Sequence, residues 1–177
     1  MAVDQSFVGR TYPPEGVYEV GAEKIREFAS AVAGAGSAAA LGGPLATAEV
    51  PAVHTDPDAA RALGHRDVVA PPTFAVVLAQ RSDARFLADP AAGVDFTRVV
   101  HGEQSFTHHR PVVAGDRLVT TLHVDGVRVA AGNAIVTTRN EIATEDGEPV
   151  CTATSVLVVR APEPSPTSTE RTAEEGA

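Results

Sequence analysis

The 177-residue sequence has no tryptophan, one cysteine and only 5% aromatic residues, and each shortage narrows what the chain can be. The single cysteine, Cys151, excludes an intramolecular disulfide. With so few aromatic rings, aliphatic and alanine side chains must fill the core. No apolar run reaches the roughly 20 residues of a membrane-spanning helix, and the N-terminus has no apolar run of signal-peptide length. We therefore expect a cytoplasmic protein that does not associate with membranes.

Charge and motif content exclude further classes of function. The formal net charge is −9, whereas a nucleic-acid-binding surface is basic and clustered. The sequence has no cysteine cluster of the kind that binds zinc. It also lacks a glycine-rich phosphate loop between a strand and a helix, and a G-x-S-x-G motif. We expect no metal, no cofactor and no nucleic-acid partner.

The chain is organised around the stretch Val68–Arg81, VVAPPTFAVVLAQR. Two prolines open it, which suits the first turn of a helix, where a missing N–H costs little. From Phe74 to Ala79 every residue is apolar, and a helix that is apolar all round must be surrounded by other elements. The stretch predicts a buried central helix.

The pattern changes to strand periodicity after Asp95, and two glycine-containing turns, Gly132-Asn133 and Asp146-Gly147, separate alternating segments. An antiparallel sheet wrapped around the central helix, an α+β fold, is therefore expected. Because one helix covers little of such a sheet and its edges invite pairing, we also expect an oligomer. The predicted helices are 22–33 and 58–63, and the predicted strands are 96–109, 116–130, 134–144 and 149–160.

We place the domain at residues 1–160, with a low-complexity loop inside it and a tail after it. Residues 34–48, rich in alanine and glycine, form a low-complexity loop within it. Residues 161–177 are rich in proline, serine, threonine and glutamate. Such a segment cannot bury enough apolar surface to offset the entropy of ordering, so it is expected to be a disordered acidic tail.

Several short motifs occur in an order that identifies a family. They are EKIREF at 23–28, HTDPDAA at 54–60, GHRDVVAPPTF at 64–74, HGEQSF at 101–106 and RPVVAGDRL at 110–118. Together they resemble the hot-dog-fold MaoC-like dehydratases, and within them the FAS1-like dehydratase N-terminal domains. The accessory subunits of mycobacterial (3R)-hydroxyacyl-ACP dehydratase are similar. The resemblance implies a hot-dog fold.

The resemblance also implies a chemistry. Active members hydrate trans-2-enoyl thioesters, or dehydrate (3R)-hydroxyacyl thioesters, with an Asp/His pair in a D-x-N-P-[LIV]-H motif. His54 stands at the histidine position and Glu49 at the aspartate position, five residues earlier. The asparagine of the motif is absent, and Glu49 is one methylene longer than aspartate, which shifts the carboxylate.

A second departure concerns the donor that polarises the thioester carbonyl, which in active members is a backbone N–H of a glycine at the start of the central helix. Pro72 stands near that position and has no N–H. If the alignment is shifted by one residue, the backbone N–H of Thr73 takes the place of this donor. Both departures favour an accessory, non-catalytic subunit that shapes the acyl-chain tunnel. The resemblance places Phe74, Val77 and Leu78 in that tunnel, and Pro72, Thr73 and His101 near the substrate.

Three hypotheses stay open. The first is this accessory subunit, paired with a catalytic hot-dog dehydratase subunit and acting on acyl-ACP or acyl-CoA in fatty-acid-type metabolism. The second is an active (R)-specific enoyl-thioester hydratase that uses Glu49 and His54. The third is a homodimeric scaffold that binds acyl thioesters without chemistry.

Overall fold

The computed structural model describes residues 3–33 and 49–161. The predicted loop at 34–48 and all but the first residue of the predicted tail lie outside the described residues. The helices are α1 (Ala22–Val32), α3 (Pro57–Ala62) and α4 (Val76–Ala88), with 3₁₀ turns η1 (Gln5–Phe7), η2 (Ala52–His54), η3 (Pro72–Ala75) and η4 (Phe96–Arg98). The strands are β1 (Thr11–Tyr12), β2 (Tyr18–Glu19), β3 (Val99–His108), β4 (Arg117–Ala130), β5 (Asn133–Thr144) and β6 (Pro149–Val159).

The six strands form one antiparallel sheet in the order β1-β4-β5-β6-β3, with β2 also paired to β4. All four long strands match segments predicted from alternation. The turn between β4 and β5 lies one residue earlier than expected, because Asn133 pairs with Ala130 in the ladder. Ala131 and Gly132 make this turn with φ angles of 49° and 79°, the positive values that a tight hairpin needs.

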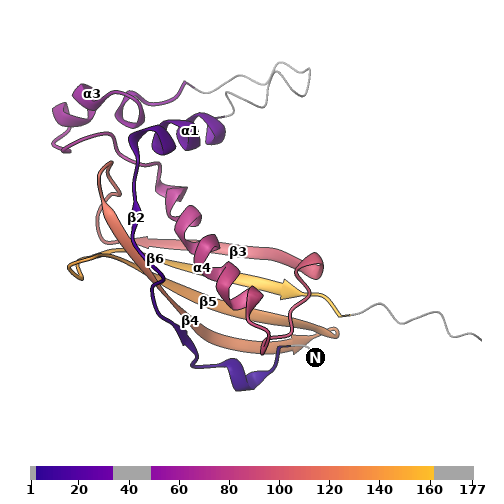
Figure 1. Ribbon diagram of the computed structural model, residues 1–177. Coiled ribbons are helices and arrows are strands. Elements are labelled where there is room, and N and C mark those ends of the chain that lie inside the picture. Colours follow the sequence, from indigo (N-terminus) through magenta and orange to yellow (C-terminus); the bar gives the residue numbers. More distant parts are fainter. Residues whose placement is uncertain (1–2, 34–48, 162–177) are drawn as a thin grey trace, which may run out of the picture.

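Helix α4 lies diagonally across one face of the curved sheet (Figure 1). Its sheet-facing residues are buried, including Leu78, Ala79 and Phe86. No residue of the apolar run Phe74–Ala79 is exposed, as predicted, and exposure begins at the polar residues Gln80 and Arg81. The hot-dog arrangement itself, an antiparallel sheet around a central helix, is confirmed.

Helices α1 and α3 lie beyond the end of the sheet, next to the N-terminal end of the central helix (Figure 1). Helix α1 turns Ile25 and Ala29 inward. Helix α3 begins where the sequence predicted, with the Asp56 side chain accepting a hydrogen bond from the Asp58 N–H and Pro57 at the first position. These elements position η2, and with it His54, beside the start of the central helix.

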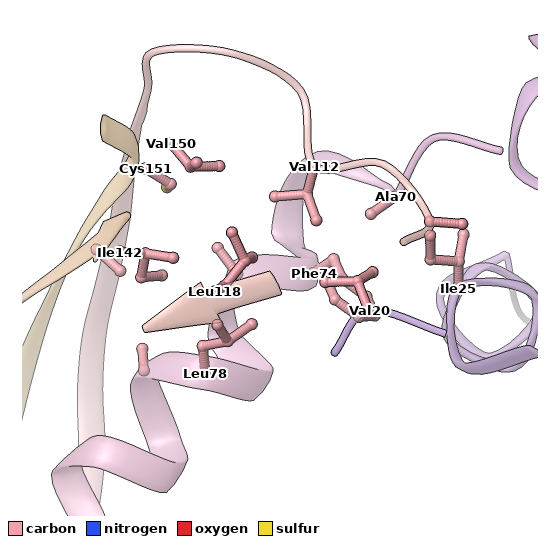
Figure 2. Packing of buried hydrophobic residues seen from close by; sticks show 14 of the residues in the cluster. Val20, Ile25, Ala70, Phe74, Leu78, Val112, Leu118, Ile142, Val150 and Cys151 are labelled. Atoms are coloured by element: carbon pink, nitrogen blue, oxygen red, sulfur yellow. The ribbon is translucent and has the colours of Figure 1, made fainter. Parts of the chain in front are cut away.

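Alternation along the strands builds the core. Inward residues of β4, β5 and β6 pack with α4 in two clusters, one toward each end of the sheet. Figure 2 shows the cluster that surrounds Phe74 and Leu78, in which Val20, Val112 and Leu118 converge on the central helix. Within the described residues, no helix combines the length and the hydrophobicity that crossing a membrane requires.

Candidate functional site

His54 lies at the end of η2, half-buried beside the segment that leads into the central helix. Its Nδ1 lies 2.6 Å from the carbonyl oxygen of Val69. A carbonyl can only accept, so Nδ1 carries the proton, and Nε2 is left with a lone pair when the ring is neutral. The Val69 N–H in turn donates to Val53 O over 3.0 Å. The imidazole therefore fastens η2 to the start of the central helix.

Glu49, the other half of the predicted catalytic pair, is exposed. Within the described residues its carboxylate forms no hydrogen bond or ion pair with His54. A carboxylate that orients an imidazole must lie within hydrogen-bond reach of it. Because the backbone carbonyl of Val69 already occupies Nδ1, only Nε2 remains for a carboxylate or a substrate. A catalytic role for Glu49 and His54 stays a prediction.

Backbone hydrogen bonds on both sides hold the start of the central helix. Ala70 N–H donates to Val112 O over 2.8 Å, and Ala114 N–H donates to Val68 O over 3.0 Å. From the end of β3, His108 Nε2 lies 2.8 Å from Pro72 O and therefore carries the donated proton. The peptide between 68 and 72 is thus clamped between the 112–114 loop and β3.

This clamped segment supplies few free donors. Pro71 caps η3 and Pro72 is its first residue, so two successive positions lack an N–H. Phe74 N–H is used by Pro71 O at 2.8 Å. Thr73 is exposed, and its N–H has no acceptor among the described residues. Only Thr73 could offer a backbone donor to a ligand at this end of the helix.

The predicted substrate-binding residues differ in how far they are exposed to solvent. Phe74 is fully buried and packs edge-on against Phe28, with ring centroids 5.4 Å apart. Leu78 is buried next to it, whereas Val77 is half-buried. Three of the six lie in or at the edge of the core, and the other three are exposed. The exposed ones are Pro72, Thr73 and His101.

Sequence reasoning missed a buried polar cluster around Asp83 on α4. This carboxylate is 4% exposed and accepts hydrogen bonds from Thr138 Oγ1 at 2.8 Å, Asn140 Nδ2 at 3.0 Å and Ser155 Oγ at 2.9 Å. Ser155 Oγ also lies 3.0 Å from Gln104 Oε1 on β3. The signal was present in the sequence, since Thr138 and Asn140 occupy inward positions of an otherwise apolar strand face.

A second buried carboxylate, Asp116, closes the loop that precedes β4. Arg110 binds it through two nitrogens, Arg66 lies 2.5 Å from it, and the Val113 N–H donates to it over 2.8 Å. Burial alone would raise the pKa of this carboxyl, but the hydrogen bonds from Arg110 and Val113 outweigh burial and hold the pKa below 3.8. Asp116 therefore stabilises the loop that clamps the start of the central helix.

In the described part of the chain, no group of three or more His, Cys, Asp or Glu side chains is placed to hold a metal ion. Cys151, the one thiol, is buried on β6, and burial raises its pKa to about 11. Such a thiol is a core residue rather than a nucleophile.

Comparison with known proteins assigns the family. Residues 44–153 match the family described as "FAS1-like, dehydratase domain region". The chain belongs to this family. A "UPF0336 protein" of Saccharopolyspora erythraea is 52% identical over 160 residues, covering 90% of this chain and 93% of the relative. A UPF0336 protein of Streptomyces avermitilis is 49% identical over 163 residues, covering 92% and 99%.

Solved structures of MaoC-like dehydratases share the fold of this FAS1-like dehydratase-region chain. The C-terminally truncated HadBC (3R-hydroxyacyl-ACP dehydratase) complex from Mycobacterium tuberculosis has a chain that is 30% identical, with a TM-score of 0.72 and coverage of 89% of this chain and 99% of that one. A "MaoC-like dehydratase" is 31% identical, with a TM-score of 0.73, but this chain covers only 43% of it. Both confirm the expected resemblance, and the first is a heteromeric complex.

Proposed function

We propose that this chain is the non-catalytic partner subunit of a heteromeric (3R)-hydroxyacyl thioester dehydratase. In this role it pairs with a catalytic hot-dog subunit and shapes the tunnel that receives the acyl chain of an acyl-ACP or acyl-CoA. The proposal rests first on the unpaired edge of β3. The HadBC complex, whose chain this one resembles, supports it, because that dehydratase is heteromeric.

Strand β3 is ten residues long and pairs with β6 along one edge, and no described strand pairs with its other edge. His109 N–H donates to Val150 O. Since antiparallel ladder bonds alternate, the N–H groups of Phe106 and His108 point to the free edge. A long unpaired edge is a template for strand addition. A second hot-dog sheet would satisfy these donors and extend the sheet.

The geometry near His54 argues against independent catalysis. The exposed Glu49 makes no contact with the imidazole in the described chain, and Pro72 removes a donor where developing enolate charge would need one. Losing one hydrogen-bond donor that stabilises such developing charge costs about 10²–10³ in rate in other enzymes. With a displaced carboxylate as well, the chain is better suited to supporting a partner's active site.

The test is hydration of crotonyl-CoA, followed by loss of enoyl absorbance. The chain alone, a catalytic hot-dog dehydratase alone, and their mixture are compared. We expect no turnover by the chain alone, and a rate in the mixture that exceeds the partner's own. Turnover by the chain alone, lost in His54→Asn, would instead support the active hydratase. Saturable acyl-thioester binding with no turnover in any mixture would support the scaffold.

The edge of β3 is tested separately with the double variant Ser105→Lys/Thr107→Lys. Lysine on an edge strand is a device by which proteins prevent edge pairing. The matched control, Thr121→Lys/Thr137→Lys, places the same charges on strands β4 and β5 inside the sheet. Light scattering should show loss of the heteromer only for the β3 variant. Equal effects of both variants would contradict pairing through β3.

A further inference from the structure

A gap in strand pairing opens onto a cavity of about 340 Å³ between the central helix and the sheet. Strands β1 and β2 both pair with β4, but β1 pairs with Leu122 and His123, whereas β2 pairs with Arg117 and Leu118. Thr120, between them, has no strand beside it on that edge. The walls of the cavity are α4, β4 and the segment that links β1 to β2. The proposed dehydratase function does not use this cavity.

The backbone of Thr120 faces the gap. At Val124, further along β4, the N–H donates to Arg10 O and the carbonyl accepts from the Gly9 N–H, each over 2.9 Å. Alternate residues of an antiparallel strand bond to the same neighbour, and the register of β4 is regular from Leu118 to Val124. The N–H and C=O of Thr120 therefore point to the same side as those of Val124. In the described part of the chain neither has a partner, so Thr120 offers the cavity an unused backbone donor.

The helix wall of the cavity also carries donors without partners. Arg81 is exposed and lies over the Tyr18 ring, 5.3 Å from the ring centroid. Its guanidinium makes no hydrogen bond or ion pair with any described residue. Ser82, the next residue, is 4% exposed, and its Oγ has no hydrogen-bond partner among the residues that the structure describes. A buried hydroxyl without an acceptor is destabilising, and the cavity that Ser82 lines has room for one.

The remaining charges of the lining form a pair at the mouth. Arg85 donates to the Pro13 carbonyl and forms an ion pair with Glu15, its Nε lying 2.9 Å from the carboxylate. The Glu15 side chain is 71% exposed, which places it at the opening. Because these two charges compensate each other, Arg81 is the unbalanced charge of the lining. A positive cavity on a chain of net charge −9 is suited to an anion.

We propose that this cavity binds a phosphate group, carried by inorganic phosphate or by a small phosphate monoester. The Arg81 guanidinium donates two parallel N–H groups from the helix, and the N–H and hydroxyl of Thr120 donate from the strand. A tetrahedral phosphate has oxygens for both walls, whereas a planar carboxylate has only two. The volume lies at the lower end of the range of about 300–1,000 Å³ typical of small-ligand sites, which leaves room for a small ester group beside the phosphate.

The site does not depend on the accessory role. Strands β1 and β2 flank β4 at one end of the strand order, and β3 forms the other end. A second sheet on β3 would therefore leave the cavity uncovered. Phosphate binding is expected in the isolated chain as well as in a heteromer, so failure of one proposal leaves the other standing.

The experiment is a titration of the full chain with sodium phosphate at constant ionic strength, observed through backbone amide signals in ¹H–¹⁵N NMR spectra. We expect a saturable shift of the Thr120 amide, with smaller shifts at Gly16 and Val17 on the same lining. Glycerol 3-phosphate is the second arm. Tighter binding than inorganic phosphate assigns the site to a monoester, and equal or weaker binding assigns it to free phosphate. Acetate should bind about tenfold more weakly than phosphate. Equal effects of acetate and phosphate, or shifts centred away from Thr120, would overturn the proposal.

Arg81→Gln should weaken phosphate binding by about tenfold or more, and an exposed side chain can be neutralised without disturbing the core. Arg128→Gln is the matched control, since Arg128 is exposed on β4 and does not line the cavity. It should bind phosphate as the unmodified chain does. Glu15→Gln should tighten binding, because it removes the negative charge of the lining. Equal losses in Arg81→Gln and Arg128→Gln would show a response to net charge alone and would overturn the site.

Discussion

The carboxylate of Asp83 connects the central helix to three strand side chains, and removing it tests whether these bonds stabilise the fold. A hydrogen bond to a charged group contributes about 1.5–3 kcal/mol net. Asp83 accepts three such bonds while almost completely buried, and no cationic side chain among residues 3–33 and 49–161 pairs with it. Part of their gain is offset by the cost of keeping the charge in the interior. We therefore expect Asp83→Ala to lower the free energy of unfolding by about 4 kcal/mol.

A loss of this size is a large fraction of the 5–15 kcal/mol typical of a domain, so a milder variant is needed beside it. Thr138→Val removes one of the three donors with little change of shape, and should cost about 1.5 kcal/mol. The double variant should cost no more than Asp83→Ala alone, because the Thr138 hydroxyl has no acceptor once the carboxylate is gone. The cycle should therefore show a coupling of at least about 1.5 kcal/mol between the two positions.

Urea unfolding followed by far-ultraviolet circular dichroism suits this chain, which has no tryptophan to report by fluorescence. Protein concentration must be held constant, since any oligomer adds to the apparent stability. Additive effects of the two substitutions would refute the reasoning, and so would a cost below about 1 kcal/mol for Asp83→Ala. Either result would mean that the carboxylate is not held by these strand hydroxyls.

Two further predictions follow from the other buried groups. The pKa of Asp116 is held below 3.8, because hydrogen bonds from Arg110 outweigh the effect of burial. Its stabilisation is therefore complete above the unfolded-state value and is lost as the pH falls through the lower folded-state pKa. Because its partners Arg66 and Arg110 are partly exposed, Asp116→Asn should destabilise the chain at pH 7 by about 2 kcal/mol, as for the loss of a charged hydrogen bond. Acid titration should show this difference shrinking below about pH 4. Cys151, whose pKa is about 11, should resist iodoacetamide at pH 8 and react fully in guanidinium. Rapid labelling of Cys151 in the folded protein would contradict its burial. A stability difference between the unmodified chain and Asp116→Asn that is the same at every pH would contradict the lowered pKa of Asp116.

Features set by local sequence were predictable. Alternation located all four long strands to within three residues, and Asp56-Pro57 located the start of α3. The absence of an N–H at Pro72 is a covalent property, so its consequence for a backbone donor could be read without a structure. Strand β2 lies within the short alternating segment Val17-Tyr18-Glu19-Val20, which predicts a strand. Strand β1, at Thr11–Tyr12, is too short to show alternation.

Features set by contacts distant in sequence were not predictable. Helix α4 continues beyond its apolar run to Ala88. Serine and aspartate usually face solvent, but Ser82 and Asp83 are buried here. They are tolerated because hydroxyl and amide groups 55 to 72 residues away reach Asp83. Alternation along β5 marks Thr138 and Asn140 as inward polar residues, but it does not identify Asp83 as their partner. The cavity beside Arg81 is equally non-local, since its walls come from three separate segments.

The structural role of His54 shapes how its catalytic role must be tested. Because Nδ1 donates to Val69 O over 2.6 Å, His54→Ala would remove a bond that fastens η2 to the start of the central helix. A loss of about 1 kcal/mol is expected from that alone. Activity lost in that variant could therefore reflect either chemistry or structure.

His54→Asn separates the two roles. An asparagine side-chain amide can donate from nearly the same position as Nδ1, but it carries no basic nitrogen in place of Nε2. If His54 serves only to hold η2, the unfolding free energy and the rate of the mixture with a catalytic partner should both stay near those of the unmodified chain. If the imidazole is a base, stability should be kept while turnover falls by the 10²–10⁴-fold typical of a lost general base. The second pattern would contradict the accessory role, because a supporting subunit has no proton to transfer.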